Sequence, residues 1–395
     1  MINPSRIKQA RVLGRLTQAQ LAESVGLQQS MIAHIEGGRY EPSEETLHAI
    51  AKVLNFPVSF FHRLGPPNFP SGSLLFRAHA TQAAADKDHA YEFGRLEYES
   101  VLLLAKKVRV KPAYKLPQLT GEYLEGEVSV REAAEQTRSA LGLSLDQPIR
   151  SLVRLIEQSG VVILALPTGS SKCDAFSQWA SIDENKNTSS TKRAFIALAS
   201  EVPGDRLRFT LAHEIGHLVL HQSVPIGSTK IEDEAHKFAA EFLMPAEVMR
   251  QQITTPIKLK DLLILKSIWG VSVAALIHRA HDLGIINDRQ NSYLNAQLNI
   301  EGWKKNEPNP IPVEKPRAIR QMAEAIYGNP INYQKLAQDL DLPPIFVKRF
   351  LDGYATKNEY LQKGKNEVTE DLSGSNITPF RPRISSKDIS SEEVM

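Results

Sequence analysis

The sequence has almost no cysteine, since Cys173 is the single one among 395 residues. One cysteine cannot form a disulfide within the chain, which excludes a small disulfide-stabilised fold and indicates a reducing compartment. Long apolar runs are missing as well: residues 161–166 form the best one, far short of the roughly 20 residues that a membrane helix needs. The first residues, Met-Ile-Asn-Pro-Ser-Arg, do not resemble a signal peptide. We therefore expect a cytoplasmic protein that does not contact membranes.

An excess of charge of one sign is also absent, because 47 Lys and Arg residues stand against 45 Asp and Glu residues. This balance indicates neither an acidic nor a strongly basic partner, so function has to be inferred from local patterns. The hydrophobic share of 42% is ordinary for folded domains. The length of 395 residues predicts about two to four domains.

The most informative pattern is His-Glu-x-x-His at residues 213–217. On a helix, His213 and His217 lie one turn apart on the same face, so their imidazole nitrogens can bind one metal ion. Glu214 projects from a neighbouring position and can act as a general base towards a water molecule. An amphipathic helix with two partly exposed histidines would show the same short pattern. The surrounding segment is apolar over most of its surface, however, and buried histidines are costly without partners such as a metal.

A catalytic zinc ion usually takes three protein ligands and keeps one position open. A third histidine six residues after His217, with glycine at the third, is excluded because those positions hold Ser223 and Leu220. His221 continues the histidine stripe, but three ligands along one straight helix would extend over about 12 Å at ~1.5 Å per residue. That is too far for one ion. We expect His221 to contact a ligand or to have a structural role.

The better source of a third ligand is the segment at residues 231–245. Its apolar residues follow helical spacing, and a proline marks the end of the helix. A second helix that packs against the first can supply a carboxylate, and Glu232, Glu234 and Glu241 are all candidates. Glu232 and His236 are spaced i, i+4, so one could bind the metal while the other orients the ligands.

These segments together resemble the ImmA/IrrE-type metallopeptidases. The resemblance extends from residue 160 to about residue 286, in blocks that read Gly-Val-Val-Ile-Leu-Ala-Leu-Pro (160–167), Asp-Ala-Phe-Ser (174–177), Phe-Ile-Ala-Leu (195–198), Arg-Leu-Arg-Phe-Thr-Leu-Ala-His-Glu-Ile-Gly-His (206–217), Glu-x-Glu-Ala-His-x-Phe-Ala (232–239) and Leu-Met-Pro (243–245). It implies a zinc cofactor bound by His213, His217 and Glu232, with Glu214 as the catalytic residue. His236 stands where the family usually has asparagine, which leaves a polar side chain at the site. The family further implies cleavage of a repressor protein, often in phage, mobile-element or stress control.

The spacing of apolar residues in segment 6–61 predicts a compact module of five short helices. Thr17 can cap the helix that follows it, and Gly26 ends that helix. The next helix covers residues 27–36 and is closed by a pair of glycines, and another covers residues 44–54. Two short helices joined at a glycine indicate a helix-turn-helix.

The module resembles the XRE/Cro-type phage repressors, in the residues Leu-Thr-Gln-x-x-Leu-Ala (16–22), Gly26, Ile32, Ile-Glu-x-Gly (35–38), Pro42 and Leu47. In that family the start of the second helix enters the major groove. The resemblance therefore implies base contacts by Gln28, Gln29 and Ser30, since glutamine can bond adenine in a bidentate way. Contacts to the DNA backbone are expected from three further residues, Gln18, Arg15 and Arg39.

The amino-terminal module is only weakly basic, so a single copy should bind DNA weakly. Specific binding to a double-stranded DNA operator is therefore expected to need a homodimer on paired half-sites. The alternative is a protein-interaction domain on the same helical fold.

Composition and periodicity divide the rest of the chain. We expect a helix-turn-helix domain at 1–64, a Pro/Gly/Ser-rich linker at 65–75, a helical connecting region at 76–160, the peptidase domain at 161–290 with a helix-turn-helix-like end, a C-terminal helical module at 291–360 and a disordered tail at 361–395. Residues 265–277 resemble residues 21–32 in sequence, and residues 333–350 resemble residues 18–35. For residues 333–350, a role in packing or partner binding is favoured over DNA contact.

The predicted fold is mainly α-helical, with a small α+β zincin-like core and helix-turn-helix-like segments at both ends. Residues 161–166 and 195–198 are the expected strands of that core. Further helices are expected at residues 92–110, 128–141 and 149–158.

Three hypotheses about function follow. In the first, the protein is a DNA-binding regulator whose zinc endopeptidase cleaves a repressor or the chain itself. In the second, the zinc site of a transcription factor senses metal or stress without cleavage. In the third, the zinc domain docks a partner in a toxin–antitoxin-like system. Glu214 favours the first hypothesis, because a purely structural site does not need a general base.

Overall fold

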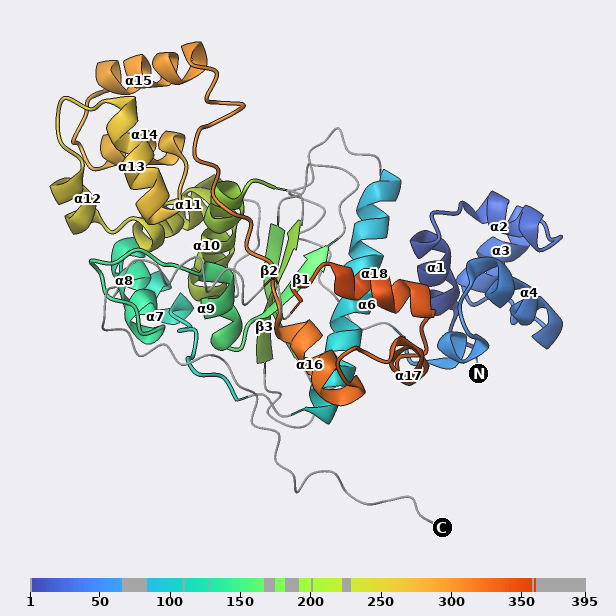
Figure 1. Cartoon of the computed structure of the whole chain (residues 1–395). Coiled ribbons are helices and arrows are strands. Elements are labelled where there is room, and N and C mark those ends of the chain that lie inside the picture. Colours follow the sequence, from blue (N-terminus) through green and yellow to red (C-terminus); the bar gives the residue numbers. More distant parts are fainter. Residues whose placement is uncertain are drawn as a thin grey trace. The chain divides into compact units, whose positions relative to one another are not determined.

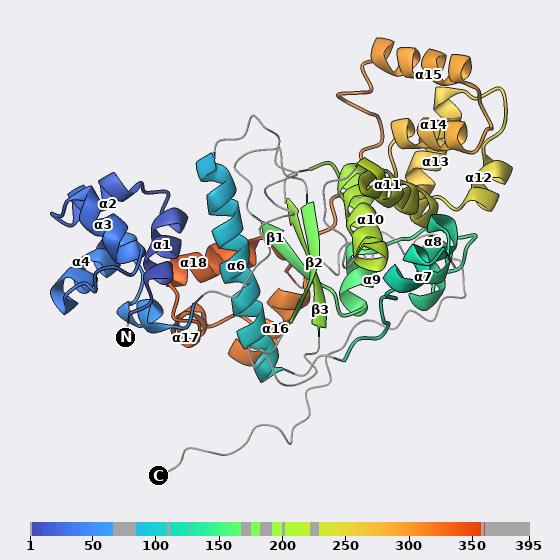
Figure 2. The same ribbon diagram turned by 180° about the vertical axis from the view of Figure 1, so that it is seen from behind.

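The computed structural model describes residues 2–65, 84–108, 111–126, 128–166, 175–181, 192–199, 202–221 and 229–356, together with Glu359. Most of these residues are helical, and a three-stranded sheet is also present (Figure 1 and Figure 2). This composition confirms the predicted fold class, which was mainly α-helical with a small α+β core. Cys173, Ser223, the linker beyond residue 65 and the predicted disordered tail lie outside the described residues.

The described residues form two compact units. Those of the first unit fall within Met1–Asn68, Glu92–Ala113 and Arg317–Met395, and those of the second fall within Phe69–Tyr91 and Tyr114–Pro316. The first unit thus combines segments that are far apart in the sequence. The connecting region expected at 76–160 contributes residues to both units.

The amino-terminal module of the first unit contains α1 (Pro4–Leu13), α2 (Gln18–Ser24), α3 (Gln29–Glu36), α4 (Glu44–Leu54) and the 3₁₀ helix η1 (Val58–His62). The Thr17 side chain accepts a hydrogen bond from the Gln20 backbone, and the Gln20 side chain accepts one from the Thr17 backbone, so α2 begins with a capping box. Gly26 has a φ of +69° between α2 and α3, where glycine is favoured. These elements form the expected helix-turn-helix.

Helix α6 (Ala84–Lys107) begins before the expected residue 92, and from Glu92 onward it belongs to the first unit. It shares that unit with α16 (Ala318–Tyr327), α17 (Tyr333–Asp339) and α18 (Pro344–Asp352). The ring of Phe346 on α18 lies 6.2 Å from the ring of Phe56 and 5.2 Å from the ring of Phe93, measured between centroids. An aromatic contact therefore joins the C-terminal module, α6 and the helix-turn-helix.

Buried charges reinforce this junction. The guanidinium of Arg6, whose side chain is 1% exposed, donates to the two carboxylate oxygens of Glu99 on α6 at 2.6 and 2.8 Å. Arg63 pairs with the same carboxylate, and the Tyr354 hydroxyl donates to Glu97, which is also buried. Arg6 and Arg63 thus share one counter-charge inside the unit, as burial of charged groups requires.

Helices α17 and α18 repeat the helix-turn-helix geometry. Asp341 has a φ of +48° at the position that Gly26 occupies in the first copy. The backbone nitrogen of the next residue donates back to α17, from Leu342 to Ala337 at 2.9 Å, and the equivalent bond in the first copy measures 2.8 Å. The predicted similarity of residues 333–350 to residues 18–35 is therefore also present in the structure. Its positions equivalent to Gln28, Gln29 and Ser30 hold Pro343, Pro344 and Ile345, which cannot donate side-chain hydrogen bonds to bases.

The sheet of the second unit has the order β1-β3-β2, from β1 (Val162–Leu166), β2 (Ala175–Ser181) and β3 (Lys192–Ala199). Strand β1 pairs with β3 in parallel and β2 pairs with β3 in antiparallel register, with Ser177 opposite Ile196. Residues 194–198 of the central strand are all buried, as expected for a continuous apolar run between neighbours. Strand β2 was not expected, because its Ala-Phe-Ser-Gln-Trp-Ala-Ser sequence has no regular apolar alternation.

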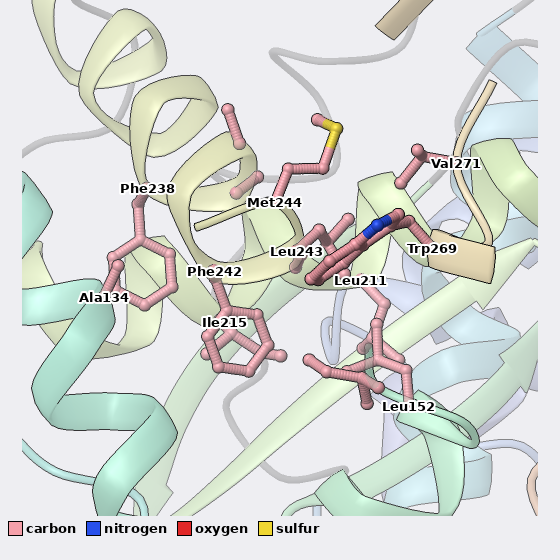
Figure 3. Close-up of a cluster of buried hydrophobic side chains, with 14 of the residues drawn as sticks. Ala134, Leu152, Leu211, Ile215, Phe238, Phe242, Leu243, Met244, Trp269 and Val271 are labelled. Carbon is pink, nitrogen blue, oxygen red and sulfur yellow. The ribbon is translucent and has the colours of Figure 1, made fainter. Parts of the chain in front are cut away.

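Two helices carry the predicted metal motifs: α10 (Gly204–Leu220) and α11 (Thr229–Leu243). They cross closely because Gly216 lies against the ring of Phe238, where a Cβ atom would come within 3.1 Å of ring carbons. Figure 3 shows Phe238 and Phe242 of α11 in one apolar cluster with Leu211 and Ile215 of α10. Burial of such side chains contributes about 1.5–3 kcal/mol each.

Further helices surround this pair in the second unit: α7 (Thr120–Leu124), α8 (Val130–Ala140), α9 (Leu152–Gln158), α12 (Ala246–Gln252), α13 (Leu259–Trp269), α14 (Val273–Asp282) and α15 (Asp288–Ile300). Arg208 of α10 donates to the carbonyls of Ile149 and Gly270 and pairs with Glu314, so one buried cation ties three distant segments together. Within the described residues no single helix has the length and apolar composition of a membrane span. Only α13 and α14 taken together have that length and composition, and the two helices are bent by 101° relative to each other.

Replacement of Glu99 by Gln should destabilise the first unit by roughly 3–5 kcal/mol, because Arg6 and Arg63 would lose their shared counter-charge inside the unit. Hydrogen exchange followed by mass spectrometry would show faster exchange in α1 and α6. Glu135→Gln breaks an exposed pair with Arg131 on α8 and serves as control, with an expected change below about 1 kcal/mol. Equal protection in Glu99→Gln and the unmodified protein would contradict this account.

Candidate metal centre

The two histidines of the motif face the first turn of α11. The Nε2 atoms of His213 and His217 are 3.1 Å apart. The carboxylate of Glu232 lies 3.2 Å from Nε2 of His213 and 3.7 Å from Nε2 of His217. Both histidines are buried, whereas the Glu232 side chain is 35% exposed, so the cluster is open on the glutamate side. The sequence motif and the downstream helix thus meet at one point.

The spacing of these ligand atoms fits a zinc ion. Ligands at about 2.0–2.1 Å from a tetrahedral zinc lie about 3.3 Å from one another. The two histidine nitrogens are 3.1 Å apart, and each lies near a different oxygen of the Glu232 carboxylate, at 3.2 and 3.7 Å, so the distances lie around that value. Two imidazole nitrogens and one carboxylate oxygen are also a ligand set that catalytic zinc sites use, with a fourth position left for water or substrate. These residues could therefore hold zinc.

The other two glutamates of α11 have different partners. Glu234 is buried and its Oε2 atom lies 3.1 Å from Nε2 of His221. Glu241 accepts a hydrogen bond from the Ala246 backbone at 2.9 Å and pairs with Arg279, which places it in the packing between α11 and α14. Of the three carboxylates that the sequence left open, only Glu232 joins the two histidines in a metal-sized cluster within the described residues.

Glu214 lies beside the cluster and is almost fully buried. The hydroxyl of Ser177 on β2 donates to its Oε2 atom at 2.6 Å and contacts its backbone carbonyl at 3.1 Å. Strand β2 is fixed against α10 by a second bond, from the indole nitrogen of Trp179 to the carbonyl of Leu218 at 2.9 Å. The sheet therefore orients the Glu214 carboxylate. Ser177 belongs to one of the blocks that resemble the peptidase family, but its role could not be derived from the sequence, because this contact depends on the pairing of distant segments.

His221 ends α10 one turn after His217, and the Nδ1 atoms of the two rings are 3.1 Å apart. Burial lowers the pKa of His221, and its hydrogen bond with Glu234 acts in the opposite direction. The ring of Tyr123 packs edge-on against His221, and burial together with a hydrogen bond to Glu234 raises the pKa of the Tyr123 hydroxyl. His221 thus contacts a ligand histidine on the side away from the cluster.

His236 occupies the outer side of the cluster. Its ring is exposed, lies 4.5 Å from the ring of His213 in an edge-to-face arrangement, and packs 5.9 Å from Phe209. Its Nδ1 atom is 2.9 Å from the backbone carbonyl of Glu232, one turn earlier on α11. The side chain therefore covers His213 and bonds to the backbone of Glu232, without joining the cluster of possible ligand atoms.

The predicted DNA contacts gather at the start of α3. Gln28 precedes the helix, and Gln29 and Ser30 begin it, all three exposed. The amide nitrogen of Gln29 donates to Gln18 at 2.9 Å, and the amide of Gln18 donates to Glu36 at 2.8 Å. Gln18 is thereby held beside the predicted base-contacting residues. The structure leaves the two expected backbone contacts, Arg15 and Arg39, with exposed side chains.

Comparisons with known proteins find family matches for two segments of the chain. The IrrE N-terminal-like domain family matches residues 156–281, and the helix-turn-helix family matches residues 7–61. An immunity repressor protein of Bacillus phage phi105 is 50% identical over 54 residues, which cover 14% of this chain and 38% of the phage protein. An uncharacterized HTH-type transcriptional regulator of Archaeoglobus fulgidus is 39% identical over 51 residues, which cover 13% of this chain and 72% of that protein.

The chain thus spans well under half of the phage repressor, and each similarity covers less than a sixth of this chain. Among solved structures, Bacillus thuringiensis PlcR in complex with the peptide PapR7 and DNA is 13% identical, with 93% of this chain and 99% of that chain covered. Its TM-score of 0.15 is too low to support a common fold. The profile matches and the archaeal relative decide the assignment: the chain belongs to the XRE-type helix-turn-helix regulators and carries an ImmA/IrrE-type metallopeptidase domain behind that module.

Proposed function

We propose that this protein is a DNA-binding transcriptional regulator whose ImmA/IrrE-type domain is a zinc-dependent endopeptidase. One observation carries the catalytic part: His213, His217 and Glu232 converge at zinc spacing, and Glu214 stands next to them with its carboxylate held by a hydroxyl. A site that only stabilised the fold would not need a buried, oriented base beside its ligands. A role on DNA also supports a location in the cytoplasm.

The chain's own residues divide the proposed reaction among them. Zinc, when bound by the three ligands, supplies Lewis-acid chemistry that lowers the pKa of a water molecule and polarises a carbonyl oxygen. Glu214 takes the proton of the attacking water as the new carbon–oxygen bond forms, and passes it to the amine nitrogen as the carbon–nitrogen bond breaks. The Ser177 hydroxyl donates to Oε2 of Glu214 at 2.6 Å and so holds the carboxylate in one orientation. The base therefore loses no conformational freedom when the substrate binds.

The proposed substrate is a repressor protein, or the chain itself. Support comes from the domain combination, in which a helix-turn-helix module is linked to a peptidase-family domain, and from the similarity of 54 residues of the chain to a phage immunity repressor. The proposed DNA partner is an operator read by Gln28, Gln29 and Ser30 at the start of α3, with two copies of the chain on paired half-sites.

Loss of one ligand should remove tight zinc binding. We expect His217→Ala and Glu232→Ala to weaken zinc affinity by more than about a hundredfold, since even the neighbours of zinc ligands contribute 10–100-fold. Competition with a chromophoric chelator measures the affinity. Glu247→Ala removes an exposed glutamate of α12 and should bind zinc like the unmodified protein. Tight zinc binding by Glu232→Ala would remove that residue from the ligand set.

Glu214→Gln should keep zinc and lose cleavage, with kcat/KM lowered by about 10²–10⁴-fold, because the amide cannot accept the proton. Ser177→Ala should lower the rate less, since it only releases the carboxylate. Cleavage of candidate repressors is followed by gel and mass spectrometry, and the inactive variant serves as a trap whose bound protein is identified after co-purification. Undiminished cleavage by Glu214→Gln would refute the peptidase proposal.

The double variant Gln28→Ala with Gln29→Ala should change operator preference, since each lost bidentate base contact costs about 1–3 kcal/mol of discrimination. Arg39→Ala should weaken binding to all sequences alike and reduce the salt dependence, as loss of a phosphate contact does. Footprinting and titration at two salt concentrations separate the two effects. Unchanged sequence preference in the double variant would exclude these glutamines as base contacts.

A further inference from the structure

A continuous line of polar contacts leads from His217 away from the metal cluster. Nδ1 of His217 is 3.1 Å from Nδ1 of His221, and Nε2 of His221 is 3.1 Å from Oε2 of Glu234. The other carboxylate oxygen of Glu234 lies 3.7 Å from Lys230, and the Tyr123 hydroxyl bonds to the same carboxylate. The three central side chains are buried.

The carboxylate at the end of this line determines where the protons lie. A carboxylate only accepts hydrogen bonds, so Nε2 of His221 must carry the proton in the bond to Glu234. A neutral imidazole has one N–H group, which makes Nδ1 of His221 an acceptor. Nδ1 of His217 must then donate to it. The remaining nitrogen of His217, Nε2, consequently presents a lone pair to the point where Glu232 and His213 meet.

We infer that Glu234 and His221 act as positioning residues that set the tautomer of His217 and so prepare its Nε2 atom for zinc. This inference rests on the proposed metal site but not on proteolysis. The relay is built from α10 and α11 and is fixed in place by α7, whose preceding residue, Leu119, donates from its backbone to the carbonyl of Val219 on α10 at 3.0 Å. Tyr123 on α7 is thereby held beside Glu234.

The other histidine ligand provides a contrast within the same site. Within the part of the chain that the structure describes, Nδ1 of His213 is buried and has no hydrogen-bond partner. Nε2 of His213 faces the Glu232 carboxylate and Nε2 of His217, and no described side chain supports the ring from its Nδ1 side. The two histidines of the motif are thus supported differently on their Nδ1 sides, and His221, which directly follows α10, accounts for the difference. Hydrogen-bond partners on the side of a ligand histidine that faces away from the metal typically contribute 10–100-fold to metal affinity.

The test uses the full-length protein and zinc alone. We expect Glu234→Gln to weaken zinc binding by about 10–100-fold, because an amide can donate to His221 and reverse the direction of the relay. His221→Phe keeps a ring beside Tyr123 and should have a similar effect. Asp233→Asn removes the same charge from the neighbouring position of α11, where Asp233 is exposed and pairs with Lys237, and should stay within about twofold of the unmodified protein.

A second readout is independent of zinc. Nitrogen NMR shifts of the His217 ring in the metal-free protein should show a protonated Nδ1, and Glu234→Gln should lose that preference. Unchanged zinc affinity and an unchanged His217 tautomer in both variants would overturn the inference, as would an equal loss of affinity in Asp233→Asn. If the unmodified protein binds no zinc, the proposed function fails, and the tautomer of His217 still decides whether the relay exists.

Discussion

The close crossing of α10 and α11 is the contact on which the candidate site depends. Gly216 lies between the two ligand histidines in sequence, and the ring of Phe238 occupies the space that any larger side chain would take. Because the helices approach at that point, a glutamate in the first turn of α11 reaches two histidines in the second half of α10. Gly216 is therefore as necessary to the candidate metal centre as His213, His217 and Glu232, although it has no reactive side chain.

The sequence predicted those parts of the site that follow from helical spacing. His213, Glu214 and His217 lie on one apolar helix, and their relation is local, so i, i+4 geometry was sufficient. The choice among the glutamates of α11 depended on how that helix is rotated against α10, which periodicity does not determine, and there only the family resemblance pointed to Glu232. Ser177 was missed because it belongs to a strand without apolar alternation. Its role arises from contacts across 37 positions of sequence.

The same limit applies to the first unit. Both helix-turn-helix copies could be recognised from their sequences, since each is held together by local turns and caps. Their association with α6 could not, because it depends on Arg6, Glu99 and Phe346, which are separated along the chain by most of its length. Repetition of a fold also did not imply repetition of its chemistry: the second copy retains the turn geometry of the first, at Asp341, but presents prolines where the first presents glutamines.

The discontinuity of the first unit has a consequence for synthesis on the ribosome. Helices α1 to α4 leave the ribosome long before α16 to α18 are made, because the entire second unit lies between them in sequence. At about 5–20 residues per second the delay is on the order of tens of seconds. During that interval Phe56 lacks the ring of Phe346, which it contacts in the finished unit, and a chain that terminates early never forms that contact. The order of translation thus makes a finished peptidase-type domain precede a finished DNA-binding unit.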